Sequence, residues 1–175
     1  MSRTFFQLLI PVLLLAASCT RPQSALQDRI GEMESTLRND SSPLPDRAMA
    51  EELMGLYLQY ANEYKDDTLS PAYLLRTGEL CVALGRYDEA LTHLAGVMKY
   101  KVTPHAAQAL FLQGFVCENY LQDLDRAKLL YGRFVQEYPA HPLANDVKTL
   151  IRQLGKSPED LIREFEAQSD SLQLP

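Results

Sequence analysis

The thiol of Cys19 is the group in this sequence that is most clearly placed for a chemical reaction. It follows the small residues 16–18, which end an apolar run that Arg3 precedes. A short positive segment, a short apolar run and a small-residue cleavage site are the three parts of a secretory signal. A thiol directly after such a site can be alkylated. We therefore predict a secretory signal peptide at residues 1–18, followed directly by the thiol of Cys19.

The residues around Cys19 resemble the lipobox of bacterial lipoproteins, although Ala16 stands where leucine is commoner. The resemblance implies that the signal peptide is cut before Cys19 and that Cys19 is lipidated, with a diacylglyceryl thioether on its sulfur and an N-acyl chain such as palmitate. The apolar run is shorter than the ~20 residues of a membrane-spanning helix, and Pro11 interrupts it. The alternative is an ordinary signal peptide with a chance cysteine. We expect a lipid anchor on a membrane surface outside the cytoplasm, because several acyl chains anchor a protein stably.

The remaining reactive residues form no recognisable catalytic motif. The three histidines, His93, His105 and His141, have no cysteine or carboxylate at metal-ligand spacing. The sequence also has no P-loop, nucleophile elbow or glycine-rich dinucleotide turn. We therefore predict a protein that is not an enzyme and that needs no metal and no cofactor.

The charge of the chain argues against nucleic acid as a partner. The formal net charge is −6, and Arg3 is the one charged residue in the predicted signal, so the mature chain is more acidic by one unit. No basic stripe offsets this acidity. Leu, Ala, Glu and Tyr dominate residues 47–168, where Gly is sparse, and this composition favours helix.

The apolar spacing and the positions of proline and glycine predict an all-α fold. We expect a dense series of helices after Asp46, with breaks at Ser70-Pro71, Gly85-Arg86, Gln122-Asp123 and the later prolines. At the first break, Ser70 is expected to cap the next helix, with Pro71 at its first position. The expected helices cover residues 46–64, 71–84, 87–101, 104–120, 124–137, 141–154 and 158–168. Paired helices joined by short turns indicate helical hairpins.

Residues 19–45 are predicted to be a tether that contains one short helix. An apolar stripe on this helix is formed by Leu26, Ile30, Met33 and Leu37. The stripe is too short to predict a coiled coil. Two interpretations remain, in which the helix either docks on the helical domain or frays.

The sequence contains an internal repeat. A shift of 74 residues places residues 56–64 on residues 130–138, with Leu, Tyr, Glu and Tyr identical. Half of this shift, 37 residues, relates Ala90 to Ala127, and Gly78 lies 36 residues before Gly114. We therefore expect one extra residue in the second turn, around residues 121–123. A period in the mid-thirties with paired helices resembles the tetratricopeptide repeat.

The resemblance to the tetratricopeptide family implies a short right-handed solenoid of antiparallel helical hairpins over residues 46–168, followed by a disordered tail at 169–175. In the family, small residues let the two helices of a hairpin approach, a bulky residue fills the space beside them, and a proline ends the repeat. An unrelated helical bundle is the alternative. The residues that match these roles are Gly78, Ala90, Leu94, Gly114, Ala127, Tyr131 and Pro139.

The repeat also leads to expectations for the two ends of the predicted array. The first unit lacks a first helix, and the stripe within residues 26–37 is a candidate for it. The last predicted helix has one apolar face, with Leu161, Ile162 and Phe165, and a charged face that suits the polar end of an array.

Cys81 and Cys117 occupy equivalent positions of neighbouring repeats. Equivalent helices lie ~9–10 Å apart, beyond the reach of a disulfide. We predict that both are small buried hydrophobic residues.

Family members bind partners in a concave groove lined by the first helix of each hairpin. Phe111 and Phe115, one turn apart, would suit an apolar side chain of a peptide or partner helix, and the alternative is that they pack against the terminal helices. The groove positions that the resemblance implies for this chain are Ala72, Leu75, Glu79, Val82, Gln108, Phe111, Phe115 and Glu118, with Asn119 adjoining.

The domain as a whole, including the phrase at residues 134–142, is similar to envelope tetratricopeptide lipoproteins of Gram-negative bacteria, such as the lipoprotein of the β-barrel assembly machinery and the repeat domain of the Tol-Pal-associated protein. The resemblance implies a lipid-anchored scaffold that binds proteins or peptide segments. Thr20, in place of the aspartate that signals inner-membrane retention, favours the outer membrane on its periplasmic side. The alternative function is a substrate- or glycan-binding accessory lipoprotein that serves an envelope enzyme or a secretion system.

Overall fold

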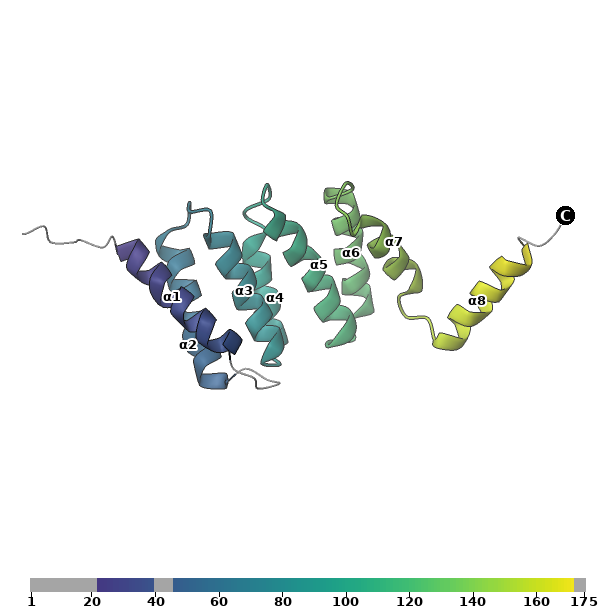
Figure 1. Cartoon of the computed structure of the whole chain (residues 1–175). Helices are drawn as coiled ribbons and strands as arrows, with labels where there is room; N and C mark the ends of the chain where they lie inside the picture. The colour runs from purple at the N-terminus through teal and green to yellow at the C-terminus, as the bar shows by residue number, and fades with distance from the viewer. Residues whose placement is uncertain (1–21, 40–45, 172–175) are drawn as a thin grey trace, which may run out of the picture.

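The computed structural model describes residues 22–39 and 46–171, and this part of the chain is all-helical (Figure 1). The all-α prediction is therefore confirmed for the described ranges, which contain no strand. The predicted signal peptide, Cys19 and residues 172–175 of the predicted tail lie outside them. The helices are α1 (Pro22–Asn39), α2 (Arg47–Glu63), α3 (Ser70–Ala83), α4 (Tyr87–Val97), α5 (Pro104–Asn119), α6 (Leu124–Glu137), α7 (Ala144–Gln153) and α8 (Pro158–Ser171).

Two helices are shorter than the apolar spacing predicts. Helix α4 ends at Val97 instead of residue 101, because the chain then turns, with the Tyr100 amide donating to the Val97 carbonyl at 2.9 Å. Helix α7 begins at Ala144 instead of residue 141, because a residue before a proline disfavours helical backbone, and His141 precedes Pro142. The imidazole Nδ1 of His141 accepts a hydrogen bond from the Leu143 amide at 3.2 Å.

Aspartate side chains cap the N-termini of α2 and α6. The Asp46 carboxylate accepts from the Met49 amide at 2.8 Å, and the Asp123 carboxylate accepts from the Arg126 amide at 3.0 Å. The prediction that Ser70 caps α3 is wrong, because Ser70 already lies inside the helix and its hydroxyl donates to the carbonyl of Tyr64 at 2.5 Å. Ser70 thereby fixes the end of α2 against the start of α3.

The turns within the two central hairpins differ by one residue. In α3–α4 the Cys81 carbonyl accepts from the Arg86 amide, and in α5–α6 the Cys117 carbonyl accepts from the Asp123 amide, both at 2.8 Å. Left-handed backbone closes the turns, with φ of 73° at Gly85 and 55° at Gln122. The extra residue that the sequence predicted in the second turn is present.

The helices lie in a row in the order of the chain (Figure 1). From α1 to α7 each helix packs against the next, and α3 also packs against α5. Helix α8 stands apart from the row in Figure 1, contributes no residue to the buried clusters of the described chain, and leaves Ile162 58% exposed. It also extends to Ser171, so that residues predicted as tail are helical. Ile162 of the predicted apolar face therefore does not seal the end of the stack.

Helix α1 docks on the domain through its apolar stripe. Leu26 and Ile30 are buried against α2 and α3, and Met33 and Leu37 pack at the edge of the same cluster. This contact decides between the two interpretations of the stripe, and it gives α2 the partner helix that the first unit lacked. The buried residues of the cluster are Leu26, Ile30, Leu53, Leu56, Tyr57, Tyr60 and Tyr73.

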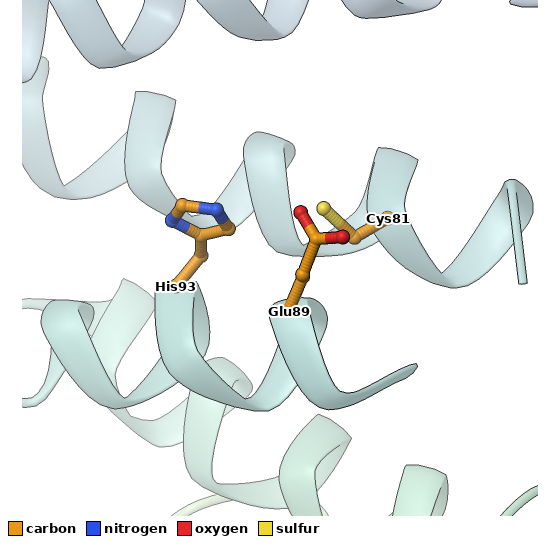
Figure 2. Close-up of side chains that lie close together, drawn as sticks. All are labelled: Cys81, Glu89 and His93. Atoms are coloured by element: carbon orange, nitrogen blue, oxygen red, sulfur yellow. The ribbon is translucent and has the colours of Figure 1, made fainter. Parts of the chain in front are cut away.

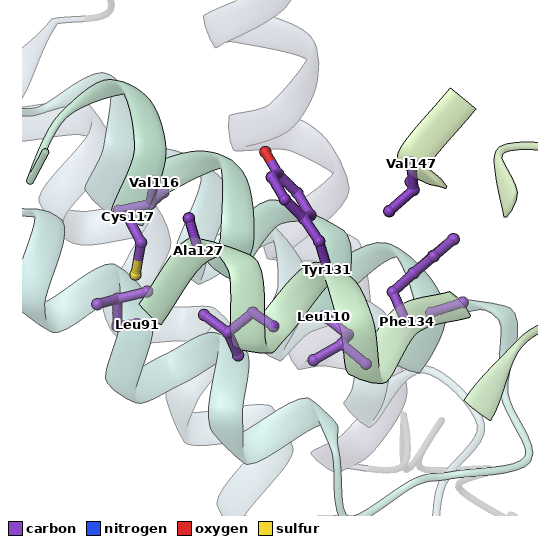
Figure 3. Close-up of a cluster of buried hydrophobic side chains, with 10 residues drawn as sticks. Leu91, Leu110, Val116, Cys117, Ala127, Tyr131, Phe134 and Val147 are labelled. Atoms are coloured by element: carbon purple, nitrogen blue, oxygen red, sulfur yellow. The ribbon is translucent and has the colours of Figure 1, made fainter. Parts of the chain in front are cut away.

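The residues that match the repeat pattern lie where the two helices of a hairpin meet. A Cβ atom on Gly78 would lie 2.7 Å from Leu94 Cδ2, and one on Gly114 would lie 2.5 Å from Tyr131 Cε1. Ala90 in α4 and Ala127 in α6 have no exposed surface, and Ala127 belongs to the large apolar cluster of α5, α6 and α7 (Figure 3). Pro139 follows the end of α6.

Candidate functional site

The predicted groove residues of α3 divide between core and surface. Leu75 does not line a groove: it is 4% exposed and packs with Leu94, Val97 and Ala109 between α3, α4 and α5. Val82 is half-buried at the edge of two clusters, and Ala72 is half-buried. Helix α5 crosses this face of α3 closely, and its small Ala109 leaves space for the leucine.

Glu79 and Gln108 remain at the surface and join α3 to α5. The Gln108 side-chain amide donates to the Glu79 carboxylate at 3.1 Å. Desolvation raises the pKa of Glu79 above its ordinary value, and the nearby Arg76 guanidinium lowers it by less. These two predicted residues therefore form one polar patch across neighbouring hairpins.

The two phenylalanines of α5 are half-buried and packed against aromatic rings. The Phe111 ring lies 5.8 Å from the ring of Tyr131 and 6.1 Å from that of Phe134, measured between centroids. The Phe115 ring lies 5.9 Å from that of Tyr120. The alternative in which these residues pack within the fold therefore describes them better than a partner anchor does, although the packing is against α6 and the α5 C-terminus and not against the terminal helices.

Glu118 and Asn119, at the end of α5, hold local structure. The Tyr131 hydroxyl donates to the Glu118 carboxylate at 2.7 Å, and the Asn119 amide donates to the Phe115 carbonyl at 3.0 Å. Burial and the Glu118 carboxylate both raise the pKa of Tyr131 far above its ordinary value. The phenol stays protonated and acts as a fixed donor.

A surface hollow of about 370 Å³ between α1, α2 and α3 was not predicted. The sequence left open whether the α1 stripe docks or frays, and the hollow forms only when α1 packs on α2 and reaches α3. Glu79, a predicted groove residue, is part of its wall. The lining residues are Glu34, Leu37, Arg38, Leu53, Tyr57, Arg76, Glu79 and Leu80.

The wall of this hollow is rigid on one side. The Glu34 carboxylate accepts from the Tyr57 hydroxyl at 2.7 Å and forms a salt bridge with Arg76. Tyr57 stacks on Tyr73 with 5.1 Å between ring centroids, and the Arg76 guanidinium lies 5.7 Å from the centre of the Tyr73 ring. Desolvation, reinforced by Glu34, raises the pKa of Tyr57 well above its ordinary value. The tyrosine hydroxyl therefore stays protonated and bonded to Glu34.

A second group of polar side chains corrects the statement that no cysteine or carboxylate accompanies a histidine. Ligand atoms of Cys81, Glu89 and His93 all lie within 4.8 Å of one another (Figure 2). Cys81 comes from α3, whereas Glu89 and His93 lie one turn apart on α4. Inspection of linear spacing missed the group because the hairpin turn folds α3 back beside α4. Only the i, i+4 pair of Glu89 and His93 was visible in the sequence.

Of the three side chains in this group, Glu89 is paired with a positive charge, and Cys81 and His93 are neutral. Arg86 donates to the Glu89 carboxylate from its Nε at 2.8 Å, and this pair lowers the pKa of Glu89. Burial raises the pKa of the Cys81 thiol and lowers the pKa of the His93 imidazole. Both groups are thereby held in their uncharged forms.

Cys81 and Cys117 are both buried and free of disulfides, as predicted. None of the described helices combines the length and apolar character that a membrane crossing requires. The sequence matches no protein-family model, and no curated protein shows significant similarity to it.

Proposed function

We propose that this chain is a tetratricopeptide-type lipoprotein of the bacterial envelope, anchored through Cys19 and facing the periplasm, and that it binds segments of partner proteins. The close approach of Gly78 to Leu94 recurs at Gly114 and Tyr131 in the next hairpin, which supports a short solenoid of repeats. The residues before Cys19 support the anchor.

The hollow between α1, α2 and α3 is the observation that carries the binding role. A solenoid of hairpins presents the first helix of each hairpin on one face. Helices α1, α3 and α5 occupy that place in the repeat, and the hollow lies between the first two of them. The hydrogen bond from Gln108 to Glu79 continues the same surface onto α5.

The side chains around the hollow indicate what kind of segment fits it. Leu37 and Leu80 provide apolar surface, and Glu34 and Arg76 neutralise each other. Arg38 and Glu79 form no salt bridge within the described ranges. The one bond of the Glu79 carboxylate named above comes from the uncharged Gln108 amide, so both charges can pair with charges on a partner. The expected ligand is a peptide segment with an apolar side chain between charged ones.

Crosslinking in intact envelopes followed by affinity purification tests this proposal. Arg38→Glu should reduce capture of the partner, because it reverses a charge at the rim of the hollow. Lys128→Glu is the matched control, since it reverses one exposed positive charge on α6. Equal capture by wild type and both variants would remove the hollow from the binding surface.

A glycan- or substrate-binding accessory role is the second candidate, and the volume of the hollow favours it, because about 370 Å³ falls within the range of small-molecule sites. A soluble glycan fragment should then raise the melting temperature of the wild-type protein and not that of Arg38→Glu. Stabilisation by glycan without protein capture would select this role over the scaffold role.

A further inference from the structure

The Cys81, Glu89 and His93 group combines three kinds of metal donor: a thiol sulfur, a carboxylate oxygen and an imidazole nitrogen (Figure 2). Their ligand atoms lie within 4.8 Å of one another, so that small side-chain rotations can bring all three to one ion. Two of the donors lie one turn apart on a single helix, and the third faces them from the helix before it. The backbone therefore holds the three side chains close together.

The next hairpin shows that the fold does not require this group. Cys117 is the counterpart of Cys81, and the 37-residue shift that relates Ala90 to Ala127 places Arg126 and Leu130 at the positions of Glu89 and His93. Cys117 is packed in an apolar cluster with Leu91 (Figure 3). Two equally buried cysteines thus have different neighbours, and three donors gather at Cys81 alone of the two.

The donors can be reached from solvent. They lie in a surface hollow of about 490 Å³ between α2, α3 and α4. The Cys81 residue is 1% exposed, His93 is half-buried, and Glu89 is exposed. An ion entering the hollow would meet Glu89 and His93 first and the sulfur last.

We propose that Cys81, Glu89 and His93 bind one Zn²⁺ ion and that water completes a four-coordinate site. Thiolate, imidazole and carboxylate are the usual protein ligands of zinc, whereas calcium and magnesium take oxygen ligands. The Met54 sulfur accepts from the Cys81 thiol at 3.6 Å, lines the same hollow and adds a further polarisable group.

Zinc binding would release one proton from Cys81 and break the salt bridge between Arg86 and Glu89. The Cys81 thiol loses its proton to solvent as the S–Zn bond forms, and the neutral His93 imidazole offers its lone pair without losing a proton. Glu89 exchanges the Arg86 guanidinium for the ion, and Arg86 keeps a second carboxylate, that of Glu51, at 3.7 Å. The other charged group of the hollow is Arg47, which pairs with Glu51 at 3.2 Å. Zinc affinity should therefore rise with pH, as the thiol proton becomes easier to displace.

Titration of the reduced full chain with Co²⁺, followed by displacement with Zn²⁺, tests the site. One equivalent of Co²⁺ should produce a thiolate-to-cobalt charge-transfer band and the visible bands of tetrahedral cobalt, and Zn²⁺ should abolish both. Cys81→Ser should lose the charge-transfer band, whereas the matched variant Cys117→Ser should keep it. Both variants retain Cys19, so a contribution from that thiol cancels in the comparison.

Glu89→Gln provides a measurement that does not depend on changing the core. Residue 89 is exposed, and the side-chain amide oxygen of the introduced glutamine can still accept a hydrogen bond from Arg86. The variant should therefore fold with wild-type helicity. Its affinity for Co²⁺ should fall by at least ~10-fold, because even outer-shell changes cost that much. A band that survives in Cys81→Ser, a band lost equally in Cys117→Ser, or an unchanged affinity in Glu89→Gln would overturn the proposal.

Discussion

Single glycines set how closely the two helices of each hairpin approach. The Cβ position of Gly114 lies 2.5 Å from the Tyr131 ring, which is fully buried and hydrogen-bonded to Glu118 and so cannot move aside. Gly114→Ala should therefore destabilise the fold by ~1–3 kcal/mol through overpacking. Gly132→Ala is the matched control, because no atom lies within 4 Å of its Cβ position, and it should stabilise α6 by ~0.5–1 kcal/mol. Urea unfolding of both variants measures the difference, and equal midpoints would contradict the close approach.

His93 makes the stability of the metal-free protein depend on pH. Burial lowers its folded-state pKa below the ordinary value of 6.5, so the unfolded chain binds protons more readily than the folded chain does. The contribution of His93 to the free energy of unfolding is therefore fully present above pH 6.5, and it is lost as the pH falls from there towards the folded-state pKa. The unfolding free energy should decline over this window, and His93→Gln should decline less. Parallel declines in the two proteins would assign the effect to other groups.

The family pattern predicted residue roles better for packing than for binding. Glycine and alanine positions depend on local helix–helix contact, which the repeat itself encodes. Whether Leu75 or Phe111 faces solvent depends on the side chains that neighbouring helices supply, such as Ala109 opposite Leu75 and Phe134 opposite Phe111. The sequence spacing alone does not contain that information, and the structure places both residues in or beside the core.

At the scale of helices, α1 was predicted as a helix and as a candidate partner of α2, but the sequence left open whether it docks or frays. Its 26–37 stripe indicates one apolar face, but several faces of the stack could accept it. The structure shows that Ile30, 1% exposed, packs into the cluster of α2 and α3. The docking of α1 completes the first hairpin and creates the hollow, so the fold of the later helices was more predictable than the candidate site.

Removing the Ile30 side chain tests this docking. Ile30→Ala should cost ~2–5 kcal/mol, because it leaves a cavity where α1 meets α2. The exposed Thr36→Ala on the same helix should change stability by less than ~0.5 kcal/mol. Thermal unfolding followed by circular dichroism compares the two, and an Ile30→Ala melting temperature equal to that of wild type would mean that α1 contributes nothing to the domain.

Across the whole molecule, the two hollows use different faces of the shared helices. The hollow of about 370 Å³ is lined by Arg76, Glu79 and Leu80 of α3, whereas the one of about 490 Å³ is lined by Thr77 and Cys81. Because successive residues of a helix point in different directions, these sets do not overlap. Partner binding at the first hollow and zinc at the second can therefore occur together, and α2 and α3 are the helices through which one could affect the other.

The proposed membrane anchor of the whole molecule is Cys19, which lies outside the described residues. Wild-type protein made in a bacterial host should partition into the detergent phase of a Triton X-114 separation, because each buried methylene of an acyl chain contributes about 0.8 kcal/mol. Its N-terminal peptide should also carry the mass of the diacylglyceryl thioether. Cys19→Ser should lose that mass and remain unprocessed or become soluble, while Cys117→Ser should behave as wild type.

Mass spectrometry is needed beside the partition, because an unprocessed Cys19→Ser chain keeps its apolar segment at residues 5–17 and can enter detergent for that reason. A wild-type N-terminus that begins at residue 19 with an unmodified thiol would identify an ordinary secreted protein. Unchanged mass and partition in Cys19→Ser would likewise contradict the anchor. In either case the binding surface would act free of the membrane, and neither the zinc site nor the packing of the hairpins would be affected, because both depend only on residues after 21.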